Sequence, residues 1–433
     1  FALKIISLFF ILILFSTIFH FIKTFYLVGY TGINIIPECY NVNCYSALTQ
    51  LVKSILFLRF FLLMLIVYLL NKLNILNFKY FFSAITFVVI VISLDIIFQY
   101  IFGYNTIGLK NSGFYNSGFF GNELMAGGFI LRLSFVAIFF TIFMFKNKNY
   151  YQYIFPAFVT SIVGIAMLFS GNRMPLVFFI FGLFLFIFLV LFLNLKIKKI
   201  LFISILSLFL SFQIIALTNN QHLSFLKQSF TSFIGAAKTM INVSGIQKWK
   251  KTSRVENKFS LGTKTTFYTA KHESLHKRIF LAALDTWKNY SVFEKIFGGG
   301  IKSFRANCWK LEKLPDFYLG DALMPGKKNR ICATHPHNYY LEILTEMGVL
   351  GIIIASLIGF MLFVFFFKNL QFFKFINFES FALLSIMISL ILETFPIKST
   401  GSLFTTNNAT YLILISSIIL CHKTLMKEKN EKN

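Results

Sequence analysis

The sequence predicts an all-α polytopic membrane protein: a bundle of about ten to twelve transmembrane helices with one large, mostly helical loop. Hydrophobic residues make up 57% of the 433 residues, 60 residues are Phe, and the mean hydropathy is +0.73. Charged residues make up only 13%, about half the share that is usual in soluble proteins. Apolar runs long enough to cross a bilayer, about 18 residues or more, recur along the chain.

Ten apolar segments are predicted to be membrane spans. They lie near residues 3–22, 50–71, 79–100, 123–145, 151–169, 174–194, 199–217, 338–367, 376–395 and 408–425. We interpret the first as a span rather than a cleavable signal, because no small-residue cleavage site follows it. The sequence begins with Phe1 rather than Met, so a further span before it is compatible with the sequence.

Lysines mark every second connection between these spans. They are Lys72 and Lys79, then Lys146 and Lys148, then Lys196, Lys198 and Lys199, then Lys368 and Lys374, and finally the tail "HKTLMKEKNEKN". Because Lys and Arg are retained on the cytoplasmic side, these connections are predicted to be cytoplasmic. The intervening connections, at 23–49, 101–122, 170–173, 218–337 and 396–407, then share the opposite face. The unusual polar motifs of the chain fall on that opposite face.

The largest of these connections, residues 218–337, divides the chain into three parts. We predict an N-terminal transmembrane bundle over 1–217, a large loop domain over 218–337, and C-terminal helices with a cytoplasmic tail over 338–433. The loop holds 20 Lys and Arg against 7 Asp and Glu, a balance of +13, and five of the seven His. Long loops are exempt from the positive-inside rule, so this charge indicates an anionic ligand. The alternative is a merely solvated, Lys-rich face.

The cysteines fit an exported face. Cys39 and Cys44 share one outer connection, and Cys308 and Cys332 share the large loop. Two pairs on the same side suggest disulfides in an oxidising compartment, with unpaired buried thiols as the alternative. Cys421 lies alone near the opposite face.

Several function classes find no support in the sequence. The basic loop carries no helix-turn-helix, zinc-finger or RNA-recognition pattern, so nucleic acid is a poor candidate for its partner. Neither a GxxxxGK[ST] loop nor a GxGxxG fingerprint occurs, which argues against nucleotide-driven work. The three glycines at 298–300 indicate a turn.

The segment "CATHPHNYYLEILTEMGVLG", residues 332–351, is the first candidate for chemistry. Asn338 is predicted to cap a helix that begins directly after it, and Pro336 keeps the preceding chain extended. His335 and His337 then lie at a helix N-terminus, where backbone N–H groups favour anions, and a neutral His there can act as a general base. Glu342 and Glu346, one turn apart, either orient a partner or satisfy the first turns of the helix.

A metal site is an alternative interpretation of the same segment. Cys332, His335 and His337 have a spacing that metal ligands use. A structural zinc site normally needs a matched second half, and none is evident in the sequence. We therefore predict no metal and no cofactor.

Arg173 is the second candidate. It precedes a strongly apolar run, and Pro175 suits the first turn of the helix that follows. An arginine at the mouth of a span can snorkel to the interface, or its guanidinium can bind a phosphate at two points.

Further candidates come from three other segments. In "HKRIFLAALDTWKN" the apolar residues Ile279, Phe280, Ala283 and Trp287 form a helical stripe that we expect to face the membrane bundle. The polar residues around this stripe are candidate ligand contacts: His276, Arg278 and, after the glycine turn, Arg305. Asn122 and Glu123 begin a predicted span, where they suit either helix packing or a substrate contact. Lys398 lies in the late polar connection.

Together these motifs resemble the O-antigen ligase / O-antigen polymerase family of bacterial envelope glycosyltransferases. The matching residues are "HPHNYYLEILTEMGVLG" (335–351), "SGNR" (170–173), "HKRIFLAALDTWKN" followed by "IFGGGIKSFR" (276–305), and "FPIKSTGSLFTT" (395–406). The chain departs from the family in one respect, since ten spans are readable where about twelve are usual.

The resemblance implies an inverting, metal-independent glycosyltransferase of the bacterial inner membrane whose active face is periplasmic. It would move a glycan from undecaprenyl-diphosphate to an acceptor hydroxyl on lipid A core or another glycan, among membrane lipids. His337 would activate the acceptor, and Arg173 and Arg278 would bind the diphosphate. His335, Asn338, His276, Arg305, Glu342, Asn122, Glu123 and Lys398 would contact substrate. The alternatives are a polysaccharide polymerase of the same family and, in another class, a transporter or flippase of an anionic lipid-linked glycan. A transporter should show internal repeats and broken helices, and the sequence shows neither.

Overall fold

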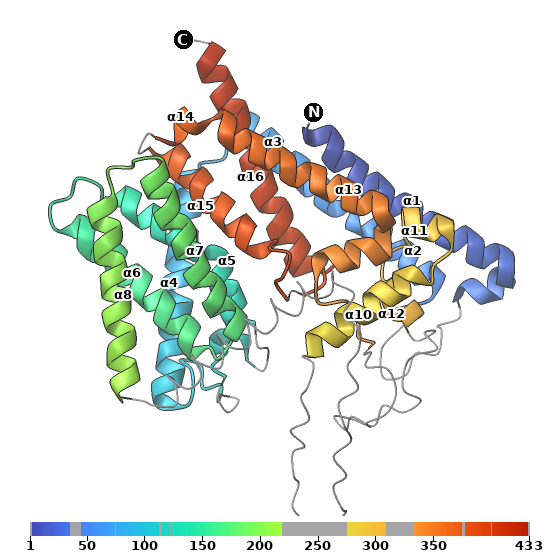
Figure 1. Ribbon diagram of the computed structural model, residues 1–433, viewed down its shortest axis with the longest axis horizontal. Helices are drawn as coiled ribbons and strands as arrows, with labels where there is room; N and C mark the ends of the chain where they lie inside the picture. Colours follow the sequence, from blue (N-terminus) through green and yellow to red (C-terminus); the bar gives the residue numbers. More distant parts are fainter. Residues whose placement is uncertain are drawn as a thin grey trace, which may run out of the picture.

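The structure is a computed structural model of the chain. It describes residues 2–34, 45–73, 75–111, 115–121, 123, 125–218, 275–308, 332–374, 377–399 and 401–431. Within these ranges the regular elements are all helices, and an isolated bridge joins Tyr104 and Lys110. Figure 1 shows long helices that run side by side, with shorter helices gathered near one end.

Eight candidate membrane spans lie in the described part of the chain, each long and apolar enough to cross a bilayer. They are formed by α1 (Ala2–Asn34), α2 (Ala47–Phe57) together with α3 (Arg59–Lys72), α4 (Phe78–Phe102), α5 (Ala126–Met144), α6 (Tyr151–Phe169), α7 (Arg173–Phe192), α8 (Lys198–Thr218) and α13 (Tyr339–Lys368). These eight correspond to the first eight predicted spans. The predicted polytopic, all-α fold class is therefore confirmed.

The last two predicted spans are helices as well, but shorter ones. Helix α15 (Phe378–Glu393) has 16 residues, and the apolar part of α16 (Thr406–Glu431) ends at Cys421. A helix of that length rises about 24 Å, less than the ~30 Å of a hydrocarbon core. The connection after α15 is partly buried: Lys398 and Ser402 lie in the interior, whereas Pro396 and Gly401 are exposed.

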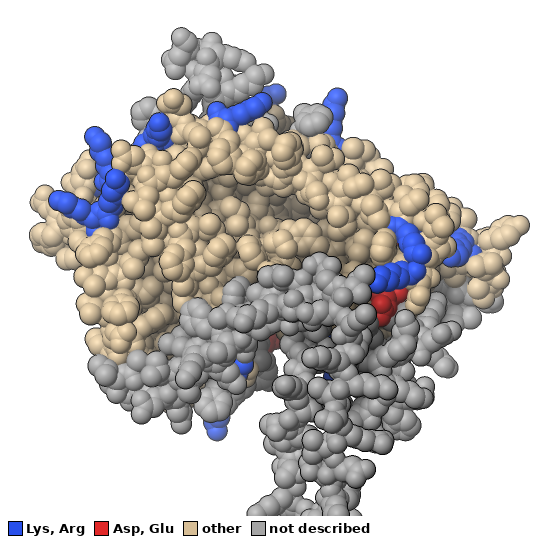
Figure 2. Space-filling model, viewed as in Figure 1, with Lys and Arg blue, Asp and Glu red and all other residues tan. Residues whose placement is uncertain are grey.

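The helices alternate in direction, so the connections collect at two ends. At one end Phe378 packs against Phe82 and Phe143, and this end carries the Lys-rich connections. At the other end Phe395 packs against Phe178 and Phe181 of α7. Figure 2 shows many of the described Lys and Arg side chains along the upper edge of the molecule, with a broad uncharged face below them.

Two apolar cores hold the bundle together. The larger is built from α4 to α8 with α15 and the middle of α16. The smaller joins α1, the junction of α2 and α3, and the first half of α13. The start of α13 therefore packs with the α1–α2 side of the molecule, whereas α7 belongs to the other side (Figure 1).

Three short helices from the large loop pack beside α13. They are α10 (Leu275–Lys288), α11 (Val292–Phe297) and α12 (Ser303–Asn307). Ile279 and Ala283 of α10 are buried in a cluster with Phe304, and Leu341 of α13 packs against this cluster. The apolar stripe predicted over 279–287 thus faces the bundle, as expected.

Helix α13 is interrupted at Gly348, whose φ of 67° is non-helical. The triglycine turn crosses the chain just before this point: Gly299 N–H donates to Thr345 O (3.1 Å) and Gly300 N–H donates to Glu346 O (3.0 Å). Such contacts satisfy carbonyls that the interrupted helix leaves open. The sequence alone did not reveal this interruption, because it could not show which backbone fills the gap.

The crossing requires glycine in both of the chain segments that meet there. A Cβ on Gly298, whose φ is +86°, would meet the carbonyl of Glu346, and a Cβ on Gly348 would meet the carbonyl of Ile296. Both φ values also lie in the left-handed region that other residues rarely adopt. The backbones can approach this closely only because both side chains are absent.

We expect Gly298→Ala to lower the free energy of unfolding by roughly 2 kcal/mol or more, from the backbone clash and the positive φ. The thermal midpoint of the purified, monodisperse protein measures this. Gly359→Ala is the matched control, because a Cβ there meets nothing within 4 Å. Equal midpoints for the two variants would contradict a tight crossing.

Candidate functional site

The candidate site lies where three segments meet: the start of α10, the start of α13, and the α15–α16 connection (residues 394–405). Asn338 joins two of them. Its Oδ1 accepts from Tyr340 N–H (3.0 Å) and Leu341 N–H (3.2 Å), which makes it the N-cap of α13 as predicted. Its Nδ2 donates to Pro396 O (2.7 Å). Both ends of the Asn338 amide are therefore engaged in structural contacts, and its expected substrate contact stays a prediction.

Three histidines from distant parts of the chain converge beside this cap. The ring centroids of His335 and His337 lie 4.1 Å apart, and those of His276 and His337 lie 5.5 Å apart. The backbone of His337 has a φ of 54°, a left-handed conformation that is uncommon for a non-glycine residue and is often found at functional positions. His337 is thus the central ring of the group.

The outer two rings are held by neighbouring hydroxyl groups. His276 Nδ1 lies 3.2 Å from Ser399 Oγ, and His335 Nδ1 lies 3.0 Å from Thr334 Oγ1. His276 is an exposed residue, yet nearby atoms partly desolvate its imidazole and lower its pKa. A neutral imidazole next to His337 adds no charge that would hinder proton uptake there.

Two arginines of the large loop lie close to this group. Arg278 and Arg305 are both buried, and Arg305 Nε donates to Thr334 O (3.2 Å). This bond links Arg305 to the segment that carries His335. The loop arginines predicted from the sequence are therefore brought to the same end of the bundle as the histidines.

Arg173 reaches that end from the other half of the molecule. It is the first residue of α7, Pro175 lies in the first turn as predicted, and Arg173 itself is half-buried. Little more than one turn further on, Phe178 packs against Phe395 with ring centroids 5.4 Å apart. The α15–α16 connection thus joins the Arg173 side of the bundle to the histidine side.

Glu342 turns away from the histidines and holds the α15–α16 connection. It is 1% exposed and accepts from Ser402 Oγ and from Leu403 N–H (2.6 Å), with Lys302 Nζ at 3.5 Å. These bonds supply the donors that a buried carboxylate needs, and the expected substrate contact of Glu342 stays a prediction. Glu346, one turn on, is equally buried beside the triglycine crossing.

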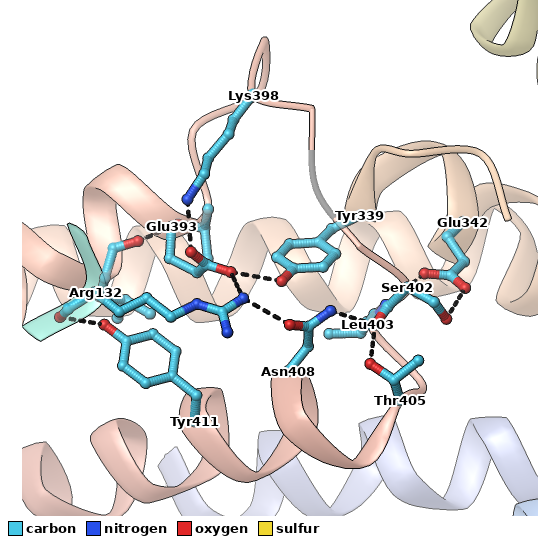
Figure 3. A network of polar contacts seen from close by, with 12 residues as sticks. Arg132, Tyr339, Glu342, Glu393, Lys398, Ser402, Leu403, Thr405, Asn408 and Tyr411 are labelled. Carbon is cyan, nitrogen blue, oxygen red and sulfur yellow. Dashed lines mark hydrogen bonds and ion pairs between the residues drawn. The ribbon is translucent and has the colours of Figure 1, made fainter. Parts of the chain in front are cut away.

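A second buried network lies behind the same connection (Figure 3). Glu393 accepts from Arg132 Nη2, from Tyr339 Oη and from Lys398 Nζ, each at 2.6 Å. Asn408 Oδ1 also accepts from Arg132 (2.6 Å), and Asn408 Nδ2 donates to Ser402 O (2.7 Å). Four helices, α5, α13, α15 and α16, are thereby tied together around one carboxylate.

The sequence analysis missed Arg132 and Glu393. Both lie inside apolar segments that we predicted to be spans, and an ionisable residue in such a segment indicates a functional or pairing role. That signal was available for each residue separately. Their pairing across 261 positions was not, because no local pattern connects them.

Lys398 is also placed differently from our expectation. Its ammonium group is buried and bound to Glu393, and it lies 5.8 Å from the centroid of the Phe178 ring. Burial lowers the pKa of Lys398, and the Glu393 carboxylate offsets part of this effect. Lys398 therefore supports the packing of the connection, and its expected ligand contact stays a prediction.

The remaining predicted contacts lie away from the histidines or cannot be placed. Glu123 is exposed and precedes α5, which begins at Ala126 rather than at the predicted residue 123. Asn122, Cys39 and Cys44 lie outside the described residues.

A disulfide joins Cys308 and Cys332, with Cα atoms 5.6 Å apart. It links the end of α12 to the histidine segment, and closing a loop with a sequence separation of 24 stabilises a fold by about 3 kcal/mol. Because Cys332 is bonded, its thiolate cannot join His335 and His337 in a metal site. Within the described ranges no group of three His, Cys, Asp or Glu is arranged to hold a metal ion.

These features define a polytopic helical membrane protein with a polar, imidazole- and arginine-bearing site at one end of its bundle. Residues 156–356, a little under half of the chain, match the family model Wzy_C, described as O-Antigen ligase. The matched region includes Arg173 and all three histidines, and it ends within α13. The family implies glycan ligase or polymerase activity on lipid-linked glycans. No curated protein and no solved structure matches the chain.

We expect Glu393→Gln to destabilise the protein by about 3–5 kcal/mol, because the change leaves the buried cations of Arg132 and Lys398 without their shared partner. Thermal unfolding measures the loss. Glu123→Gln, which removes an exposed carboxylate, should leave the midpoint unchanged. Adding Lys398→Met to Glu393→Gln should recover part of the loss, and strictly additive effects of the two changes would argue against a coupled network.

Proposed function

We propose that this protein is a glycosyltransferase of the ligase type that moves a glycan from undecaprenyl-diphosphate to an acceptor hydroxyl on lipid A core or a similar molecule. The proposal places the protein in the bacterial inner membrane with its site on the periplasmic face. The observation that carries it is the convergence of His276, His335 and His337 with loop arginines at one end of the bundle, inside the matched domain.

In the proposed reaction, His337 accepts the proton of the acceptor hydroxyl. The hydroxyl oxygen attacks the anomeric carbon of the donor sugar, and the bond from that carbon to the diphosphate oxygen breaks with its electron pair. Attack from the face opposite the leaving group inverts the anomeric configuration. A hydroxyl is a weak nucleophile without a base, so the imidazole contributes typically 10²–10⁴-fold.

Arg173 and Arg278 are proposed to bind the diphosphate as its negative charge increases. Cations that are already in place when charge develops lower the barrier without further reorganisation. The donor diphosphate is itself the activated group, so the reaction needs neither nucleotide nor metal. The disulfide between Cys308 and Cys332 supports the periplasmic location, because disulfides persist in oxidising compartments.

A polymerase of the same family would use the same donor and differ in its acceptor. Surface glycan that is still polymerised but no longer attached to lipid A in a deletion strain would support the ligase. Loss of polymerisation would support the polymerase.

A transporter of an anionic lipid-linked glycan is favoured by one observation, the interruption of α13 at Gly348 beside the buried Glu342 and Glu346. Discontinuous helices with buried charges are common in transporters. This second candidate would be supported if neither the wild type nor a His337 variant transferred sugar while the variant still moved the lipid across vesicle membranes.

We expect His337→Gln and Arg173→Gln each to reduce glycan transfer by about 100-fold or more while the protein stays folded. The measurement is transfer from a purified polyprenyl-diphosphate glycan to candidate acceptors by the reconstituted protein. Lys374→Gln, at the opposite end of the bundle, is the control for loss of a positive charge. Wild-type rates in both test variants would remove the proposed roles.

Transfer by the wild-type protein should continue at an unchanged rate after treatment with EDTA, because the proposed base and cations are side chains. The same reconstituted assay measures the rate before and after chelation. A loss of transfer activity that is restored by added Mg²⁺ or Zn²⁺ would show that the reaction depends on a metal ion, contrary to the proposed mechanism.

A further inference from the structure

A second group of cations lies on the α1–α2 side of the histidines. The Lys53 Nζ lies 3.3 Å from the centroid of the Tyr45 ring, and the Arg305 Cζ lies 4.8 Å from the same centroid. Lys53 comes from α2 and Arg305 from α12. Two positive charges from distant parts of the chain therefore share one aromatic ring.

The position of the ring is well defined. Gln50 Nε2 donates to Tyr45 O (3.2 Å), and the next residue, Ser46, caps α2 by accepting from Thr49 N–H (3.2 Å). Tyr45 and Lys53 are both half-buried, so they remain accessible from the surface. The ring and the start of α2 thus form a fixed support for the two cations.

This group lies next to the candidate site and is not part of its histidine cluster. Arg305 Nε donates to Thr334 O, and Thr334 Oγ1 lies 3.0 Å from His335 Nδ1. Two short contacts therefore connect the cations to the histidines. Arg173, in contrast, belongs to α7 in the other half of the bundle (Figure 1). Cations thus flank the histidines from two sides.

We propose that Tyr45, Lys53 and Arg305 form a binding site for a phosphate group carried by the acceptor substrate. This inference rests on the proposed glycan transfer. A phosphate monoester carries a charge of about −1.5 to −2 at neutral pH, which matches two cations. A guanidinium can bind it at two points, and the Tyr45 hydroxyl can donate a further hydrogen bond. The hydrogen bond from Lys53 and the nearby positive charges lower the pKa of Tyr45, in agreement with a positive local potential.

The acceptor is the more suitable source of this phosphate because Arg173, one of the two arginines proposed to bind the donor diphosphate, lies in the other half of the bundle. A transferase that holds both substrates across one base needs an anchor for each of them. The anchor at Tyr45 would fix the acceptor so that its hydroxyl meets His337.

The test compares two acceptors in the reconstituted transfer assay: a phosphorylated acceptor and the same acceptor after phosphatase treatment. For the phosphorylated acceptor, Lys53→Gln and Tyr45→Leu should each raise the acceptor KM about tenfold, the effect of losing one charge-assisted or cation–π contact. The donor KM and kcat should not change. For the treated acceptor, wild type and variants should share the same raised KM. Lys374→Gln is the charge control.

Direct binding separates failure of this site from failure of the proposed function. Inorganic phosphate titrated into the purified full-length protein by calorimetry should bind wild type at least about fivefold more tightly than Lys53→Gln. Wild type that binds phosphate here but transfers no glycan would refute the proposed function alone. Equal phosphate binding by both proteins would overturn the site. If phosphatase treatment left the acceptor KM unchanged although Lys53→Gln bound phosphate more weakly, the site would belong to a lipid headgroup and the acceptor role would be overturned. A rise in the donor KM of the variants would also overturn the acceptor role.

Discussion

The structure depends on two carboxylates that hold a non-helical connection inside a membrane bundle. Glu393 lies near the start of the α15–α16 connection and binds Lys398. Glu342 lies near its end and accepts from the Ser402 hydroxyl and from Leu403 N–H. Buried irregular backbone needs partners for its polar groups within the protein. The two carboxylates supply such partners for the buried part of the connection, whereas Pro396, Gly401 and Thr405 are exposed.

The buried connection in turn positions the site. Pro396 O receives the Asn338 amide that caps α13, and Ser399 Oγ contacts the His276 ring. Phe395 packs against α7, the helix that begins with Arg173. One segment of twelve residues therefore sets the relative positions of the histidine segment, α10 and α7. Its own side chains are mostly engaged in this support, which explains why Lys398 faces Glu393.

At the interruption of α13, on the other side of the site, irregular backbone likewise finds partners within the protein. The N–H groups of Gly299 and Gly300 donate to the carbonyls of Thr345 and Glu346 near the interruption. Thr17 Oγ1 of α1 accepts from Ile301 N–H (3.2 Å). The large loop is thus locked into the bundle by backbone contacts. These backbone contacts hold α12, with Arg305, beside the histidine segment. The Cys308–Cys332 disulfide links the end of α12 to the same segment.

The sequence by itself determined the helices, their alternation and the identity of most candidate groups. Hydropathy and lysine placement are local properties, so they predict α1 to α8 and α13 without knowledge of packing, and the Asn338 cap and Pro175 follow from neighbouring residues. Which polar groups hold the fold through buried contacts became visible only in the tertiary structure. Glu342 and Lys398 have the same chemistry in either role, and their partners lie elsewhere in the chain or across a turn that no periodicity describes. Arg132 and Glu393 meet across 261 positions, because a buried charge must find its counterion wherever the packing brings one.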